Sequence, residues 1–241
     1  MKKFNVTSML LQAALAIFLI SCGGGDEKST NDATSTETAS TTVNTIVTTP
    51  QAMVIVIHKV ADYAKWKSGY DAHDSARLAN GLHNYVIGRG LNDSNTVLVA
   101  LKADDMAKAK AFAQSQDLKT VMQKAGVVGQ PTMNFLTATW QDTSDVGAIP
   151  RSLTTFSVKD WDAWVKNFEE GKQERTDNGI VARVISHDAD DNKKVALVTA
   201  VTDTTKAFAF YKSDALKKRR EAGGVIGEPQ RFLFTIAARY R

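Results

Sequence analysis

The sequence contains a single cysteine, Cys22, which excludes both an internal disulfide framework and a cysteine-rich metal site. No glycine-rich phosphate loop follows a strand pattern, and the sequence has neither a His-x-x-x-His pair nor a serine nucleophile elbow. The formal net charge is only +4, and acidic and basic side chains alternate through the predicted helices. A face that binds nucleic acid is therefore not expected. The sequence likewise predicts no metal and no cofactor.

The N-terminal residues predict an exported protein. A positive start, Met1–Lys3, precedes an apolar run, Met9–Ile20, that is too short to span a bilayer. The run ends in Leu19-Ile20-Ser21-Cys22, which resembles the lipobox of bacterial lipoproteins. The alternative is a core helix with a buried cysteine, but the position at the N-terminus and the polar sequence that follows favour a signal peptide.

The lipobox resemblance implies that residues 1–21 are removed as a signal peptide and that a lipid on Cys22 anchors the protein to a membrane. Gly23, in place of Asp, follows the cysteine and favours the outer membrane of the bacterial cell envelope. Residues 22–51 are rich in Ser and Thr and have almost no apolar content before Val43. Such a segment buries too little surface to offset the entropy lost on ordering, so we expect a flexible tether.

The rest of the sequence matches itself at a fixed offset of 98 residues. Because the match continues through helix patterns and strand patterns alike, it indicates an internal duplication and not a chance similarity. We therefore predict a first domain at 52–141, a connector at 142–150 and a second domain at 151–241. Equivalent residues include Val60 and Val158, Asp62 and Asp160, Trp66 and Trp164, Arg77 and Arg175, and Gly129 and Gly227.

Each predicted domain has the element order β-α-β-β-α-β. In the first, Asp62 is an expected N-cap, Asn80-Gly81 an expected helix end, and Ser115 an expected break in the later helix. Right-handed crossovers turn this order into a four-stranded antiparallel sheet with both helices on one face, the ferredoxin-like fold of the α+β class. The expected elements are a strand at 53–57, a helix at 62–80, strands at 82–89 and 96–101, a helix at 104–125 and a strand at 132–140.

A sheet with helices on one face leaves its other face uncovered. Two such sheets packed face to face form an α/β barrel with the helices outside, and here one chain supplies both sheets. We therefore predict a monomer that is an intramolecular pseudo-dimer. Either half alone would expose a large apolar face, which favours association.

The stretch from His58 to Trp66, followed by His73 and Arg77, resembles the first helix region of the dimeric α/β-barrel superfamily, also called antibiotic-biosynthesis-monooxygenase-like. Ala111–Leu118 and Ala125–Pro131 are similar to its second helix and to the entry to its last strand. The resemblance implies an α/β barrel. The superfamily includes cofactor-independent oxygenases, haem-dependent enzymes, lactone isomerases and members without known activity, so the fold does not choose a function.

The histidines are the remaining candidates for chemistry. His58 ends the first strand, and His73 shares a predicted helix face with Trp66 and Tyr70, so we expect these four side chains around one cavity. Structural hydrogen bonds for the histidines and core packing for Trp66 are the plainer alternatives. If the pair is catalytic, a neutral imidazole acts as general base on a phenol or an enol, and Trp66 and Tyr70 form an apolar ligand-binding wall.

In the second domain, Phe156 replaces His58 and Gly171 replaces His73, so we expect its cavity to be filled by packing alone. Because the second domain lacks both histidines, the chain has at most one intact site. This favours a tethered protein that binds a small apolar or aromatic ligand or acts as a scaffold. The alternative is a cofactor-independent monooxygenase or isomerase that acts on a small aromatic or enolic substrate in the first domain. The other histidines are expected outside any site, at a strand edge for His83 and in a solvated turn for His187.

Overall fold

The computed structural model describes residues 44–240. The predicted signal peptide, Cys22 and most of the predicted tether lie outside these residues, so the lipid anchor stays a prediction. Within the described part of the chain, no helix combines the length and the apolar character that a bilayer crossing requires. The described residues belong to one compact unit.

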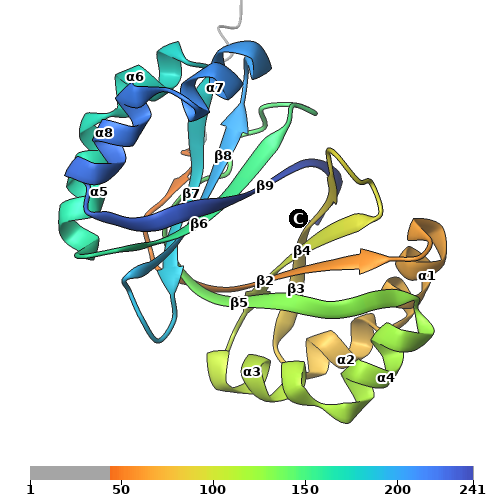
Figure 1. Cartoon of the computed structure of the whole chain (residues 1–241). Helices are drawn as coiled ribbons and strands as arrows, with labels where there is room; N and C mark the ends of the chain where they lie inside the picture. The colour runs from red at the N-terminus through yellow and green to blue at the C-terminus, as the bar shows by residue number, and fades with distance from the viewer. Residues whose placement is uncertain (1–43, 241) are drawn as a thin grey trace, which may run out of the picture. The chain divides into compact units, whose positions relative to one another are not determined.

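The first half of this unit follows the predicted element order (Figure 1). The expected N-cap is confirmed, since the Asp62 carboxylate accepts a hydrogen bond from the backbone N–H of Lys65 at 2.7 Å. The break at Ser115 is also confirmed, because its hydroxyl caps the helix that follows. The elements are β1 (Ile46–Val47), β2 (Gln51–Val60), α1 (Tyr63–Ala72), α2 (Asp74–Ala79), β3 (Leu82–Gly90), β4 (Thr96–Ala103), α3 (Met106–Gln114), α4 (Gln116–Lys124) and β5 (Val127–Asp142).

Two expectations for this half are corrected. The predicted helix at 62–80 is interrupted at His73, which ends α1 and begins α2 with φ −97° and ψ 15°. The end of the predicted tether is part of the fold, because Ile46–Val47 pairs with β5 as a short antiparallel strand. The Thr45 hydroxyl adds a hydrogen bond to the Asp142 carboxylate at 3.1 Å, so the chain is already attached to the sheet before β2 begins.

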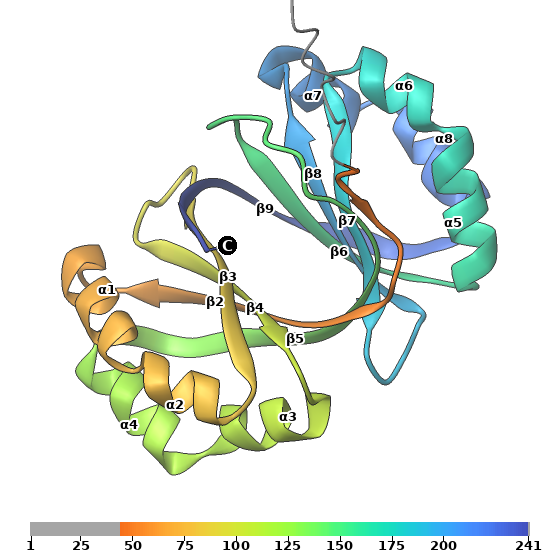
Figure 2. The same cartoon turned by 180° about the vertical axis from the view of Figure 1, so that it is seen from behind.

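The second half repeats this order of elements and divides both of its helical segments in the same way (Figure 2). Asp160 caps its first helix as Asp62 does in the first half, by accepting from the backbone N–H of Ala163 at 2.8 Å. The elements are β6 (Arg151–Val158), α5 (Trp161–Glu170), α6 (Lys172–Asp177), β7 (Ile180–Asp188), β8 (Lys194–Val201), α7 (Thr204–Tyr211), α8 (Asp214–Ala222) and β9 (Val225–Arg239).

All strands belong to one antiparallel sheet that closes on itself. The order is β5-β2-β4-β3 in the first half and β9-β6-β8-β7 in the second, and the pairings β3–β9 and β5–β7 join the two. Because β1 lies outside this ring of eight strands, on β5, the ring itself has no free edge. Helices α1–α4 pack on the strands of the first half and α5–α8 on those of the second (Figures 1 and 2).

Alternation along the strands separates two kinds of core. In β2, Met53 and Ile55 point to the inner face, whereas Val54 contacts the cluster beneath the helices that includes Trp66. The continuous apolar run of β2 is therefore explained by burial on both faces. Both halves fill the inner core, which comprises Met53, Ile55, Val86, Leu98, Ala100, Leu136, Ala138, Leu153, Ala196 and Phe234.

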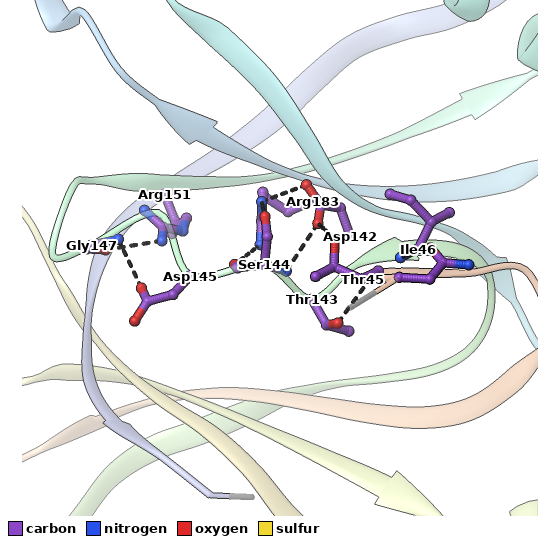
Figure 3. A network of polar contacts seen from close by, with 10 residues as sticks. Thr45, Ile46, Asp142, Thr143, Ser144, Asp145, Gly147, Arg151 and Arg183 are labelled. Carbon is purple, nitrogen blue, oxygen red and sulfur yellow. Dashed lines mark hydrogen bonds and ion pairs between the residues drawn. The ribbon is translucent and has the colours of Figure 1, made fainter. Parts of the chain in front are cut away.

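The segment between β5 and β6 is held by two buried arginines (Figure 3). Arg183 of β7 donates to the Asp142 carboxylate at 2.7 Å and to the Ser144 hydroxyl at 3.0 Å. Arg151 donates to the carbonyl oxygen of Gly147 at 3.2 Å. The connection between the halves is therefore fixed by charged hydrogen bonds as well as by its short length.

Candidate functional site

A cavity of about 80 Å³ lies between the sheet of the first half and its four helices. His58, Trp66, Tyr70 and His73 all line it, so the structure brings together the four residues that the sequence placed around one site. Their roles in binding or catalysis stay predictions. Apart from Arg77, the rest of the wall is apolar and includes Val54, Val56, Val99, Leu101, Phe112, Leu118, Met122 and Met133.

The aromatic residues form a continuous row along the cavity. The ring centroids of His58 and Trp66 are 5.4 Å apart, and those of Trp66 and Tyr70 are 5.1 Å apart in a stacked arrangement. Trp66 is only 3% exposed and belongs to the core cluster beneath the helices. Trp66 is therefore also a packing residue, as the plainer interpretation expected. One side chain can pack in the core and line a cavity at the same time.

His58 is buried, and its ring has no polar partner in the part of the chain that the structure describes. Val54, Val56 and His58 alternate along β2 and face the helices, and the pairing of β2 with β5 shifts register at His58 itself, between Ile57 and Lys59. The His58 side chain is 5% exposed, and neither ring nitrogen has a hydrogen-bond partner among the described residues. Burial lowers its pKa from 6.5 to about 4, so the imidazole is neutral at pH 7.

Tyr70 is fixed by a polar network at the end of the row. Its hydroxyl donates to the Asn84 side-chain carbonyl, which also accepts from Arg77 Nε at 3.2 Å. Arg77 donates to the backbone carbonyl of Tyr70 at 2.8 Å and to the Asp74 carboxylate at 3.1 Å. Burial raises the pKa of the Tyr70 phenol, so this group remains a hydrogen-bond donor and does not act as a base. Asn84 and Asp74 were not identified from the sequence.

His73 occupies the cavity wall at the break between α1 and α2. Its ring stacks on Phe112 at a centroid distance of 5.9 Å. Burial and the nearby Arg77 guanidinium lower its pKa, while Asp117 acts in the opposite direction. The side chain is half-buried, so His73 reaches the solvent as well as the cavity.

The two remaining histidines lie away from this cavity. His83 at the start of β3 is exposed and contacts the Asp104 carboxylate at 2.8 Å, as expected for a strand edge. The expectation for His187 is wrong, because it lies within β7 and not in a turn. Its ring packs edge-on against Trp161 at 4.8 Å, and Nδ1 is 2.8 Å from the backbone carbonyl of Asp188.

The second half contains its own cavity, of about 90 Å³, where packing alone was expected. Phe156 and Trp164 repeat the ring contact of the first half at the same centroid distance, 5.4 Å. The expectation considered only the two histidines, whereas arginines from α6, α8 and β9 also line this space.

The comparisons with known proteins establish the fold and nothing finer. No family model matches the sequence, and neither does any curated protein. Among solved structures, an anthrone oxidase-like protein superposes with a TM-score of 0.53 at 11% identity, over 80% of this chain and 94% of its own. The fold is that of the dimeric α/β barrels.

Two further structures agree with this assignment. A monooxygenase-like protein of Fusobacterium nucleatum has a TM-score of 0.51 at 11% identity, over 78% of this chain and 93% of its own. A chlorite dismutase-like protein has a TM-score of 0.50 at 12% identity, over 78% of this chain and 95% of its own. At these identities the similarity carries no information about substrate.

Haem, which some dimeric α/β barrels bind, does not fit the first cavity of this chain. Pockets for drug-sized ligands measure about 300–1,000 Å³, several times the 80 Å³ found here. His58 has ring nitrogens that would ligate an iron, but Trp66 and Tyr70 fill the space beside it. Among residues 44–240, no group of three or more His, Cys, Asp or Glu side chains is arranged to hold a metal ion.

Proposed function

We propose that the first-half cavity binds a small, mainly apolar ligand that carries one hydroxyl or carbonyl group. The observation that supports this is the buried His58, whose two ring nitrogens have no partner among the described residues. A neutral imidazole offers one donor and one acceptor, and leaving both unpaired in an apolar wall is costly. A polar group on a ligand in the cavity would satisfy one of them.

The size of the cavity limits the ligand. An apolar cavity of about 150 Å³ is known to hold benzene, and the 80 Å³ available here is about half of that. An aromatic ligand therefore requires side chains at the wall to move. Met122 and Met133 are half-buried and flexible, so they are the residues that can make room.

The pKa values favour binding over catalysis by general base. A base works best when its pKa is near the working pH, and His58, at about 4, is far below neutrality. Tyr70 keeps its proton and donates a hydrogen bond to the Asn84 side chain. What supports the alternative, a cofactor-independent monooxygenase or isomerase, is the fold alone.

Phenol and toluene test this proposal because they differ mainly in a hydroxyl and a methyl group. We expect the full-length protein to bind phenol more tightly, by about fivefold for one net hydrogen bond of about 1 kcal/mol. His58→Phe, which copies Phe156, should remove that preference, and Phe156→His should leave it unchanged. Met122→Ala should strengthen the binding of both compounds. If His58→Phe still prefers phenol to toluene, the proposed ligand site at His58 is refuted. If the protein consumes oxygen in the presence of phenol, the alternative of a monooxygenase is supported.

We further propose that the two halves are duplicated ferredoxin-like domains, at 52–141 and 151–241, which form a pseudo-dimer within a monomer. The shared strand order and the inner core contributed by both halves support this. We also propose that Cys22 is lipidated and anchors the protein to the outer membrane. The lipobox resemblance supports the anchor, and fractionation of a Cys22→Ala variant tests it.

A further inference from the structure

The wall of the second cavity differs from that of the first by its charge. Rings of Phe156, Trp164 and Phe168 line it as the aromatic row lines the first. Four arginines complete the wall, whereas the first cavity has one. At the offset of 98 residues, Arg219, Arg220 and Arg231 occupy the positions of Val121, Met122 and Met133, which all line the first cavity.

Arg175, the fourth arginine, has lost the partners that its counterpart Arg77 keeps. In the first half, Asp74 and Asn84 bind the Arg77 guanidinium. The equivalent positions in the second half are Lys172 and Ala182, whose side chains cannot accept a hydrogen bond from a guanidinium. Arg175 is nevertheless buried, at 8% exposure, and its Nε has no partner among the described residues. Its guanidinium donates to the backbone carbonyl of Phe168 and lies over the Phe168 ring.

Arg231 is in a similar position. Its Nε also has no partner in the described chain, and its guanidinium lies 3.5 Å from the centre of the Tyr211 ring. The Tyr211 hydroxyl, too, is buried and has no partner between residues 44 and 240. Arg175, Arg231 and Tyr211 therefore all line the same cavity, and each has one polar atom without a partner among the described residues.

None of the described residues that line this cavity is acidic. Glu174 pairs with Arg219 Nε at 2.7 Å and neutralises one charge. Glu174 and Glu169 also act on Arg175, and Glu228 acts on Arg220, but only at a distance and without an ion pair. Burial lowers the pKa of Arg175 to about 10, which leaves it charged at neutral pH. A buried cation without an anion destabilises a fold, so the arrangement favours an anion supplied from outside.

We infer that the second cavity binds a small organic carboxylate, with its oxygens on Arg175 and Arg231 and its apolar part against Trp164 and Phe168. Guanidinium groups match carboxylate oxygens in geometry and charge, and the aromatic walls favour an organic anion over an inorganic one. The volume of about 90 Å³ equals that of about three waters in the liquid, so the anion has only a few carbon atoms. This site is separate from the one proposed in the first half.

Propionate is a suitable probe, with propionamide as its neutral analogue and phosphate as an inorganic oxyanion. We expect calorimetry on the full-length protein to show saturable binding of propionate and none of propionamide. Arg231→Met copies Met133, a residue that the first half accommodates, and should weaken propionate binding by about tenfold or more. Lys218→Met removes an exposed charge of the same helix as Arg219 and should leave binding unchanged. His58→Phe should also leave it unchanged, which separates this site from the first.

Stability without ligand provides a second measurement. Arg231→Met removes a half-buried charge that has no anionic partner among the described residues, so it should raise the Tm of the ligand-free protein while it weakens propionate binding. Arg175→Gln should weaken propionate binding in the same way, if it folds. The assignment is overturned if propionate does not bind, if phosphate or propionamide binds as tightly, or if Arg231→Met binds propionate as the parent protein does.

Discussion

Replacing His58 by Phe should make the protein more stable and less sensitive to acid. The second half shows that Phe fits this position, because the Phe156–Trp164 ring distance equals that of His58 and Trp66, 5.4 Å. At pH 7.5 the variant no longer buries an unpaired imidazole, so its free energy of unfolding should rise by about 1 kcal/mol or more.

The pH dependence of the same variant is a sharper test. Because the pKa of His58 is about 4 in the folded protein and 6.5 when solvated, the unfolded chain binds a proton in this range that the folded protein does not. The free energy of unfolding should therefore fall as the pH falls below 6.5. Each pH unit of this range costs about 1.4 kcal/mol, which gives a loss of about 2 kcal/mol between pH 7.5 and pH 5.

Urea unfolding at both pH values, followed by tryptophan fluorescence, measures this loss. His58→Phe should lose about 2 kcal/mol less than the parent protein over this range, because carboxylates contribute equally to both. His83→Gln, which changes an exposed histidine, should keep the parent's pH dependence. If His58→Phe unfolds with the same pH dependence as the parent, His58 is not buried as a neutral, unpaired group and the proposed site fails.

Three further predictions concern the rest of the molecule. Arg183→Met should lower the free energy of unfolding by about 3 kcal/mol in urea titrations, since it leaves the Asp142 carboxylate without its buried partner; Lys194→Met, at an exposed ion pair, should cost less than about 1 kcal/mol. Residues 44–142 expressed alone should dimerise or aggregate in size-exclusion chromatography, and a stable, folded monomer would contradict the pseudo-dimer. Cys22→Ala should move the protein out of the membrane fraction or leave its signal peptide uncleaved, whereas a processed, membrane-bound variant would exclude the lipid anchor.

The sequence predicted the order of the elements because local signals were strong. Asp62 and Ser115 are helix caps that depend on neighbouring backbone groups only, and the structure confirms both. The break at His73 and the pairing of Ile46–Val47 with β5 were missed. His73 carries no Gly or Pro signal, and the strand pairing depends on a partner about a hundred residues away.

The candidate site was predicted in part for similar reasons. Alternation and helical spacing brought His58 and Tyr70 to one cavity, because these are short-range periodicities. The two ring nitrogens of His58 lack partners among the described residues because the side chains that α3 and α4 place around the cavity are apolar. No local pattern in the sequence near His58 reveals this. The arginines of the second cavity were visible at the fixed offset, and comparing Arg231 with Met133 position by position would have found them.

Joining both halves of the closed sheet in one chain has a genetic consequence. In a barrel assembled from two identical chains, one codon specifies the same residue in both cavities, so every substitution appears twice. Here each cavity has its own codons, and Met133 and Arg231 can differ although they occupy equivalent positions. A mutation in one cavity therefore leaves the other cavity of the same molecule unchanged. The unchanged cavity then serves as an internal reference, because an effect that appears in both cavities is not specific to the mutated site.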